Sequence, residues 1–301
     1  MIDPLSLYSL DAAVAESMAG RRPVLLNLLD GFVDAGQVGR TITSTILENC
    51  EHEVLATFDH DQLHDYRSRR PTIVFDSNRF TELTEVHVLL HKVTDSHGEV
   101  FLLLEGPEPD MRWELMLAAI EDLVDTFSVR LVISAQGIPM AVPHTRPIAL
   151  TEHGTDPERL TSTHNWIDRV EMPASFAAVL EYRLGRRDRS AHGFAAHVPH
   201  YLTQASYTPA VIQVMSAINQ LSGLTLPTEA LDEALTATVE EIERETADSE
   251  EVQRVVQGLE EQYDAWTQRG GPALPSADEI GAEFERFLAE QDKNDPPESG
   301  M

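Results

Sequence analysis

The sequence predicts an α/β layered fold with a largely parallel or mixed sheet, followed by an acidic helical extension. Over the first 225 residues, short apolar runs of strand length alternate with segments of helical periodicity, which is the pattern of layered α/β proteins. After Thr228 the apolar residues repeat only every three or four positions, and residues 229–301 hold 21 Asp and Glu against 5 Lys and Arg. We therefore expect a core domain over residues 1–225, a helical extension over 226–292 and a disordered tail over 293–301.

The first half of the chain alternates predicted strands with two predicted helices. Pro23–Leu29 is a continuous apolar run, typical of a strand that is buried on both faces. One helix is expected from Val38, and a second after Pro109, where Asp110 is a candidate N-cap. The other runs of strand length are Glu53–Phe58, Thr72–Phe75, Glu85–His91, Val100–Leu104 and Arg130–Ser134.

The second half is expected to contain fewer strands and to end in helices. The predicted elements are a short strand near Ile167–Glu171, a helix over Ala174–Leu184 that stops at Gly185, a strand over Phe194–Leu202 and a helix over Ala210–Leu221. In the extension, apolar stripes run from Leu231 to Ile242 and from Val252 to Tyr263, and Ser276 with Glu279 forms a capping box. These helices are too acidic and too short to be stable alone, so we expect them to pack on the α/β body or on another subunit.

The formal net charge of −29 excludes two classes of partner. Nucleic acids and anionic membranes both bind clustered Lys and Arg, which this composition does not favour. The single cysteine, Cys50, leaves no intrachain disulfide and fits a reducing compartment. The N-terminus does not resemble a secretory signal, and no apolar run reaches the roughly 20 residues that cross a bilayer. We expect a soluble, cytoplasmic protein.

The most distinctive stretch is Ser134–Pro147, which follows a predicted buried strand and contains three prolines. Each proline fixes its own φ and biases the preceding residue toward an extended conformation, so the stretch is expected to be a stiff loop. A stiff loop after a buried strand commonly presents a functional surface. The candidate binding residues in it are Pro139, Pro143, His144, Thr145 and Arg146.

The turn Gly31–Gly39 lies between a predicted strand and a predicted helix, where phosphate-binding loops occur. Gln37 and Val38 occupy the positions where a P-loop has Lys and Ser or Thr, which argues against nucleotide binding. Asp34 is better explained as a helix N-cap, with Gln37 completing a capping box. The turn and the proline-rich loop both follow strands, so a pocket between them is an alternative; its candidate residues are Gly31, Asp34, Gly36 and Glu105.

A basic island stands out in this acidic chain: Tyr66, Arg67, Arg69 and Arg70. Guanidinium groups are suited to bidentate contacts with a partner's carboxylates. His60 and His64 precede the island at a spacing that suits zinc, yet no third ligand is evident, so we predict no metal site. The carboxylates of this loop are instead expected to pair with the arginines.

Hydrolytic chemistry is not favoured. Ser134 follows a strand, but the glycines of a Gly-x-Ser-x-Gly elbow are missing, and a triad with His144 or His200 depends on geometry. His192 and His197 are better explained by hydrogen bonds in the core or at an interface. We assign no catalytic residue, metal or cofactor.

Several segments resemble the bacterial branch of the proteasome assembly chaperone family. The matching stretches are Asp30-Gly-Phe-Val-Asp-Ala-Gly36, Asp65-Tyr-Arg-Ser-Arg-Arg-Pro71, Glu105-Gly-Pro-Glu-Pro-Asp-Met-Arg-Trp113, Gly137-Ile-Pro-Met-Ala-Val-Pro-His-Thr-Arg-Pro147 and His197-Val-Pro-His-Tyr-Leu202. They fall between Pro23 and about Leu221, and the proline-rich stretch is the most specific of them. The acidic helical extension lies outside the shared part.

The resemblance implies a three-layer α/β/α fold, related to nucleoside phosphorylases, and a role in protein assembly rather than catalysis. It also implies proteasome α subunits as a partner, although the chain ends in Glu298-Ser-Gly-Met301 where chaperone members often have a hydrophobic-Tyr-X tail. We accordingly expect a non-enzymatic assembly chaperone or scaffolding protein that forms a homo-oligomer. The alternative is an enzyme or sensor for a small molecule, such as a nucleoside or a carboxylate, with its pocket at the sheet edge.

Overall fold

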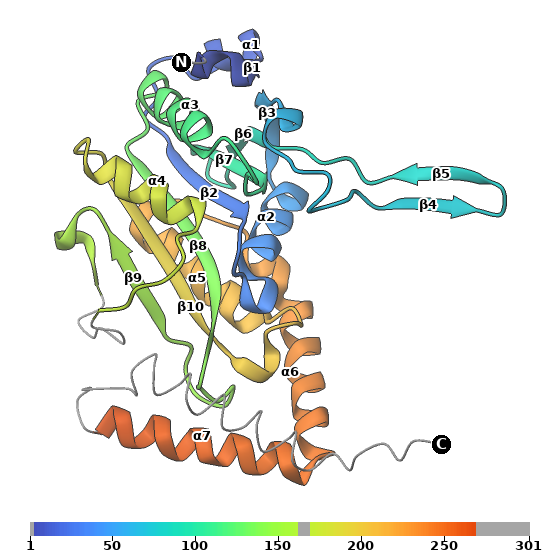
Figure 1. Cartoon of the computed structure of the whole chain (residues 1–301). Helices are drawn as coiled ribbons and strands as arrows, with labels where there is room; N and C mark the ends of the chain where they lie inside the picture. Colours follow the sequence, from blue (N-terminus) through green and yellow to red (C-terminus); the bar gives the residue numbers. More distant parts are fainter. Residues whose placement is uncertain (1–2, 162–168, 269–301) are drawn as a thin grey trace.

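A computed structural model describes residues 3–161 and 169–268 of the chain. Its body has three layers, with a mixed eight-stranded sheet between two layers of helices (Figure 1). The predicted fold class is therefore confirmed. The sheet has the strand order β1-β3-β6-β7-β2-β8-β10-β9, and its strands are β1 (Tyr8–Leu10), β2 (Val24–Asp30), β3 (Glu51–Phe58), β6 (Leu89–Thr94), β7 (Val100–Pro107), β8 (Leu131–Met140), β9 (Leu150–Gly154) and β10 (Ala191–Pro199).

The central strands of the sheet run parallel. β2 pairs in parallel with β7 on one side and with β8 on the other, and β10 is parallel to β8. β6 is antiparallel to β7, and β3 is antiparallel to β6, so β3 has the same direction as the central strands. Five strands consequently end at one edge of the sheet, which is the edge where the loops of interest begin.

The apolar run in β2 explains why this strand is central. Leu26 and Leu28 contribute to the core on one face of the sheet, and Leu25 contributes to the core on the other. Side chains of a strand alternate between faces, so a strand covered by helices on both sides needs an unbroken apolar run.

Helices cover both faces of the sheet. One core lies under α2 (Val38–Asn49) and α5 (Thr208–Ser222), and the other lies under α1 (Ala12–Ser17), α3 (Trp113–Thr126) and α4 (Phe176–Gly185). The predicted cap of the helix after Pro109 is wrong, because the N-cap of α3 is Arg112 in a left-handed conformation. Gly185 is the last residue of α4 rather than a residue beyond it, and the strand predicted to begin at Glu85 begins at Leu89.

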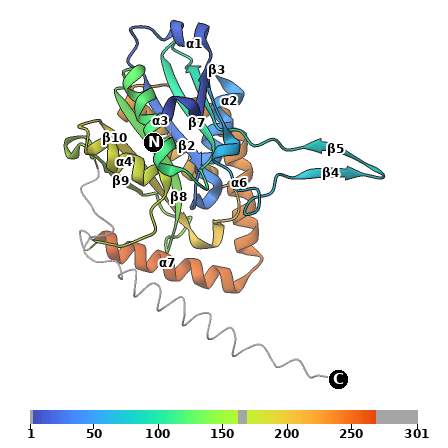
Figure 2. The same ribbon diagram turned by 45° about the horizontal axis from the view of Figure 1, so that its top comes forward.

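A two-stranded hairpin projects from the body as an arm (Figures 1 and 2). It consists of β4 (Ile73–Asp76) and β5 (Arg79–Leu83), which pair only with each other. The strand predicted over Thr72–Phe75 thus exists, but it lies outside the main sheet. We refer to β4, β5 and the turn between them as the arm.

The acidic extension contains two described helices, α6 (Asp232–Ala247) and α7 (Glu250–Gln268). Leu231 and Ile242 belong to the same buried cluster as α2 and α5, whereas α7 runs across the lower end of the sheet in Figure 1. The expected capping box at Ser276 and the tail lie outside the described residues. Of the strand expected over Ile167–Glu171, residues 167 and 168 also lie outside them, and the described residues 169–171 form no strand. Within the described residues, no helix combines the length and apolar character needed to cross a bilayer.

Candidate functional site

The candidate site lies at the sheet edge where the five parallel strands end. After β2 the chain crosses one face through α2 toward β3, and after β7 it crosses the opposite face through α3 toward β8. Adjacent connections that leave in opposite directions open a crevice at the carboxyl ends of the strands, where layered α/β proteins place their ligands. The Gly31 turn, the basic island and the end of β7 all come to this edge.

Asp34 fastens the Gly31 turn to its surroundings. Its carboxylate accepts backbone N–H bonds from Gly39 at 3.0 Å, Arg40 at 3.2 Å and Gly137 at 3.1 Å. Burial raises the pKa of Asp34, and these three N–H groups only partly offset that effect. The Asp34 carboxylate therefore accepts N–H groups from the first turn of α2, but the N-cap residue of α2 is Gln37 and not Asp34 as predicted. Gln37 does not complete a capping box either, since its amide donates to the Gln204 carbonyl.

Part of the turn packs directly against β8 and the start of α5, so the space between the turn and the proline-rich stretch is reduced to a small cavity lined by Gly31, Asp34 and Ser134. A Cβ on Gly137 would lie 1.9 Å from the Ala35 carbonyl oxygen, and one on Gly36 would lie 2.9 Å from Cβ of Tyr207. Only glycine permits approaches this close. Gly36 is thus part of the packing and lines neither of the two cavities at this edge.

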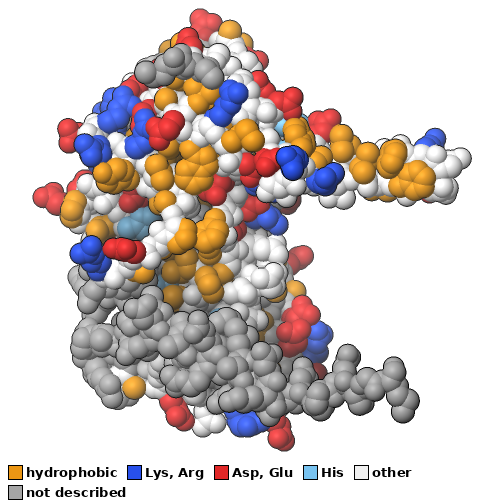
Figure 3. Space-filling view, in the orientation of Figure 1, with side chains coloured by type: hydrophobic (Ala, Val, Ile, Leu, Met, Phe, Trp, Pro, Cys, Tyr) orange, Lys and Arg blue, Asp and Glu red, His pale blue; other side chains and the backbone are white. Residues whose placement is uncertain are grey.

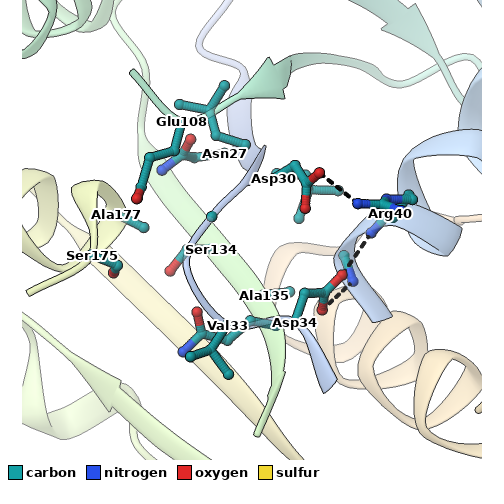
Figure 4. A pocket seen from close by; sticks show the side chains of 15 residues that line it. Asn27, Asp30, Val33, Asp34, Arg40, Glu108, Ser134, Ala135, Ser175 and Ala177 are labelled. Atoms are coloured by element: carbon teal, nitrogen blue, oxygen red, sulfur yellow. Dashed lines mark hydrogen bonds and ion pairs between the residues drawn. The ribbon is translucent and has the colours of Figure 1, made fainter. Parts of the chain in front are cut away.

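The smaller cavity lies above Gly31 and Asp34 (Figure 4). Its volume is about 30 Å³, enough for one water molecule. Asn27 of β2 and Ser134 of β8, which are paired in register, lie in its wall with Glu108. Asn27 is 3% exposed, and its Oδ1 has no hydrogen-bond partner among the described residues. The smaller cavity can hold water, but it is too small for a metabolite.

The larger cavity has a volume of about 430 Å³ and lies at the root of the arm. It shares Asp30 and Arg40 with the smaller cavity, and these two side chains form an ion pair of 2.6 Å (Figure 4). Of the predicted pocket residues, Gly31 and Asp34 line the smaller cavity, Glu105 lines this larger one and Gly36 lines neither. The other charged or titratable side chains in its wall are His64, Arg69, Arg70, Glu85 and His87.

The basic island is held by Asp110 rather than by the carboxylates of its own loop. Asp110 forms an ion pair of 2.8 Å with Arg69 and accepts the backbone N–H of Asp65 at 2.7 Å. Burial opposes ionisation of Asp110, but the Asp65 N–H and the Arg69 guanidinium outweigh it and lower the pKa of this carboxyl group. The expected pairing of the loop's own carboxylates with the arginines is wrong, because Asp61 accepts the Tyr66 hydroxyl instead.

The proline-rich stretch begins as a strand and only later becomes a loop. β8 continues through Pro139 to Met140, pairing with β10 beyond the point where β2 has turned away. This places Pro143 and the residues after it far along the edge from the Gly31 turn. The expectation that a loop begins at Ser134 is therefore wrong; pairing with β10 keeps the chain extended for six more residues.

Within the loop, two of the three polar residues contact α7. Arg146 binds Asp264 and Glu260, and the Thr145 hydroxyl donates to Glu260. The ring of His144 lies 2.8 Å from the Tyr201 hydroxyl, and burial lowers the pKa of His144. These residues are thus engaged within the chain, and their role as a partner surface stays a prediction.

The structure gives no support to a serine hydrolase arrangement. Ser134 lines the small cavity, whereas His144 bonds Tyr201 beyond the end of β8, and no hydrogen bond joins Ser134 to His144 or His200 within the described residues. His197 is buried and contacts the Thr151 hydroxyl at 2.8 Å, which is a core hydrogen bond. The described part of the chain holds no group of three or more His, Cys, Asp or Glu side chains placed to bind a metal ion.

Sequence reasoning missed two features of this edge. Asn27 is the only polar residue in the apolar run of β2, and that position alone marked it for attention. The arm also had a signal, because Asp76-Ser-Asn78 is a turn sequence between Ile73–Phe75 and Phe80. Nothing local marked the ion pair between Asp30 and Arg40.

A sequence profile described as the PAC2 family matches residues 28–246. The chain belongs to the PAC2 family. Two solved structures of proteins of unknown function resemble this PAC2 protein. The one from Corynebacterium glutamicum is 35% identical, with a TM-score of 0.82 over 87% of this chain and 99% of the other. The one from Mycobacterium tuberculosis is 37% identical, with a TM-score of 0.83 over 95% and 96%.

A more distant solved structure shares the fold. It is the M. tuberculosis proteasome-assembly chaperone homologue, which is 21% identical and has a TM-score of 0.70 over 77% of this chain and 99% of its own. Among curated proteins, none matches the chain. These similarities establish the family and the architecture, and leave the function to be argued from the molecule itself.

Proposed function

We propose that this PAC2 protein is a non-enzymatic assembly chaperone or scaffolding protein that forms a homo-oligomer through its arm. The observation that carries the proposal is the exposure of apolar side chains along β4 and β5. Phe75 is 60% exposed and Phe80 is 67% exposed, and their rings contact each other at a centroid distance of 5.1 Å. Ile73, Val74 and Leu83 are also exposed. Hydrophobic side chains are visible along the arm in Figure 3.

An isolated two-stranded hairpin with an apolar surface is marginally stable in water. The arm contributes no side chain to either buried cluster of the body. Exposed apolar patches of this kind are typical of protein interaction sites, and each arm strand has a free edge, because it pairs only with the other. A second copy of the chain would cover both the aromatic surface and the strand edges.

Family membership supports an assembly role. The M. tuberculosis neighbour with the same fold is a proteasome-assembly chaperone homologue. We therefore propose proteasome α subunits as the first partner to test, by purifying the native complex from cell extract and identifying the co-purified proteins by mass spectrometry. Recovery of α subunits in stoichiometric amounts would support this partner, and recovery of this protein alone would contradict it.

Self-association is tested with a double variant, Phe75→Ser with Phe80→Ser, and with Phe32→Ser as the matched control. Phe32 is 66% exposed but lies in the Gly31 turn and not on β4 or β5. Sedimentation velocity should report an oligomer for the wild type and for Phe32→Ser, and a monomer for the double variant. An oligomer that persists in the double variant, or one that dissociates in Phe32→Ser alone, would contradict the role of the arm.

A second candidate function is the sensing of a small molecule. The cavity of about 430 Å³ at the carboxyl edge favours it, since small-molecule sites commonly occupy a few hundred Å³ at this edge. Thermal shift measurements with metabolite panels test this function independently of self-association. Stabilisation by one chemical class would support it, and the absence of any shift would count against it.

A further inference from the structure

The larger cavity has an uneven distribution of charge. Its lining carboxylates each have a cationic or histidine partner: Asp30 with Arg40 at 2.6 Å, Glu85 with His87 at 3.3 Å and Glu105 with His91 at 3.2 Å. The lining arginines are not all matched in this way. The guanidinium of Arg70 has no hydrogen-bond or ion-pair partner in the described part of the chain. The cavity therefore retains one free cationic group.

The backbone that presents Arg70 is held rigidly from two sides. The side chain of His64 is 4% exposed, and the distance from its Nε2 to the Arg69 carbonyl oxygen is 2.7 Å. A carbonyl oxygen only accepts, so Nε2 carries the proton and donates it. On the other side, Arg69 is held by Asp110 and donates to the Glu108 carbonyl at 2.6 Å.

Two further details favour an anionic ligand next to this segment. The buried Nε–H of Arg69 has no acceptor among the described residues. Figure 3 shows Lys and Arg side chains gathered where the arm leaves the body. In a chain with a net charge of −29, such a site is a local exception. An unpaired guanidinium beside a cavity is suited to a planar carboxylate, which it can bind through two parallel hydrogen bonds.

We propose that the cavity at the root of the arm binds a monocarboxylate, with Arg70 holding the carboxylate group. This names the ligand class for the second candidate function, and it does not depend on self-association. A polycarboxylate is disfavoured, because Asp30, Glu85 and Glu105 in the same wall repel a second negative charge. Free amino-acid derivatives and the carboxyl terminus of a peptide share the required chemistry.

The test uses four probes on the full chain: N-acetylalanine, its amide, trialanine and citrate. Binding is measured by saturation-transfer NMR at millimolar concentrations and by calorimetry where the heat allows. N-acetylalanine should bind the wild type, and its amide should not. Tighter binding of trialanine would identify a peptide terminus as the source, whereas tighter binding of N-acetylalanine would identify a small metabolite.

The decisive variant is Arg70→Gln, and Arg22→Gln is its matched control. Arg22 is exposed, as Arg70 is, and its substitution removes the same charge. Arg22 does not line the cavity: it precedes β2, whereas the cavity lies at the other end of this strand. Arg70→Gln should weaken binding at least tenfold, Arg22→Gln should leave it unchanged, and Arg70→Lys should be intermediate because it keeps the charge but loses the planar fork.

Four outcomes would overturn the proposal. They are no binding of either monocarboxylate, unchanged binding in Arg70→Gln, an equal loss in Arg22→Gln, which would indicate long-range attraction only, and preferential binding of citrate. None of these readings depends on the mass of the oligomer, so failure here is distinguishable from failure of the arm test.

Discussion

The guanidinium of Arg146 forms two parallel hydrogen bonds with the carboxylate of Asp264, from Nε at 2.8 Å and from Nη2 at 2.7 Å. These residues are 118 positions apart, and they fasten α7 to the loop that follows β8. The bond lowers the pKa of Asp264, and burial opposes this only in part. Since both groups stay ionised well into acid, the contact persists throughout the physiological range.

Arg146→Ala should release α7 from the proline-rich loop. We expect several-fold faster hydrogen exchange in Glu250–Gln268 and little change in β2 and β8, because the lost contact lies at the periphery. Arg244→Ala is the matched control, since its ion pair with Glu241 lies within one turn of α6. Unchanged exchange in α7 would show that its position does not depend on Arg146.

Asp34→Ala should destabilise the protein without any ligand being involved. Three backbone N–H groups would lose their acceptor, at a cost of about 2 kcal/mol. Asp34→Asn keeps one acceptor oxygen and should cost less. Asp30→Asn is the control, because its ion pair with Arg40 is exposed and should contribute little. Urea unfolding measures the stability of all three variants. Equal stability of the wild type and Asp34→Ala would contradict a structural role for this carboxylate.

Gly137→Ala and Gly258→Ala should act in opposite directions. At Gly137 a Cβ would collide with the Ala35 carbonyl, so the Gly31 turn must move from β8, and we expect a loss of about 3 kcal/mol. Gly258 lies within α7 and has open space around it, so alanine should stabilise the helix by up to about 1 kcal/mol. Denaturant titration measures the free energy of unfolding of both variants, and a change of the same sign in both would contradict this packing.

The stability of the protein should fall as the pH drops from about 6.5 to 4. Burial lowers the pKa of His197 to about 4, so between these values the unfolded chain binds a proton that the folded chain does not. The free energy of unfolding therefore falls progressively below pH 6.5, and the loss amounts to about 3 kcal/mol once the pH is below 4. His197→Gln should flatten this part of the pH profile in urea titrations, and equal slopes in the two proteins would contradict it.

The structure confirmed much of what the local sequence indicated about the fold. The run from Val24 to Leu29 forms a strand buried on both faces, and α2 and α5 lie where their apolar spacing places them. Periodicity reports which side of an element is covered, and it is a local property. The boundaries were less accurate where tertiary pairing prevailed, as in β8, which remains a strand through Pro139 because β10 runs beside it.

The sequence by itself determined the layered α/β class, the helical character of the acidic extension and the membership of the PAC2 family. It did so because strand and helix patterns and family motifs are written in consecutive residues. Only the tertiary structure decided three outcomes. Asp34 binds the backbone N–H of Gly137, 103 residues away, and Arg146 binds Asp264 of α7. Arg70 is left without a partner among the described residues, beside a cavity. Those outcomes depend on which distant groups the fold brings within hydrogen-bonding distance, and the spacing of residues along the chain carries no information about that.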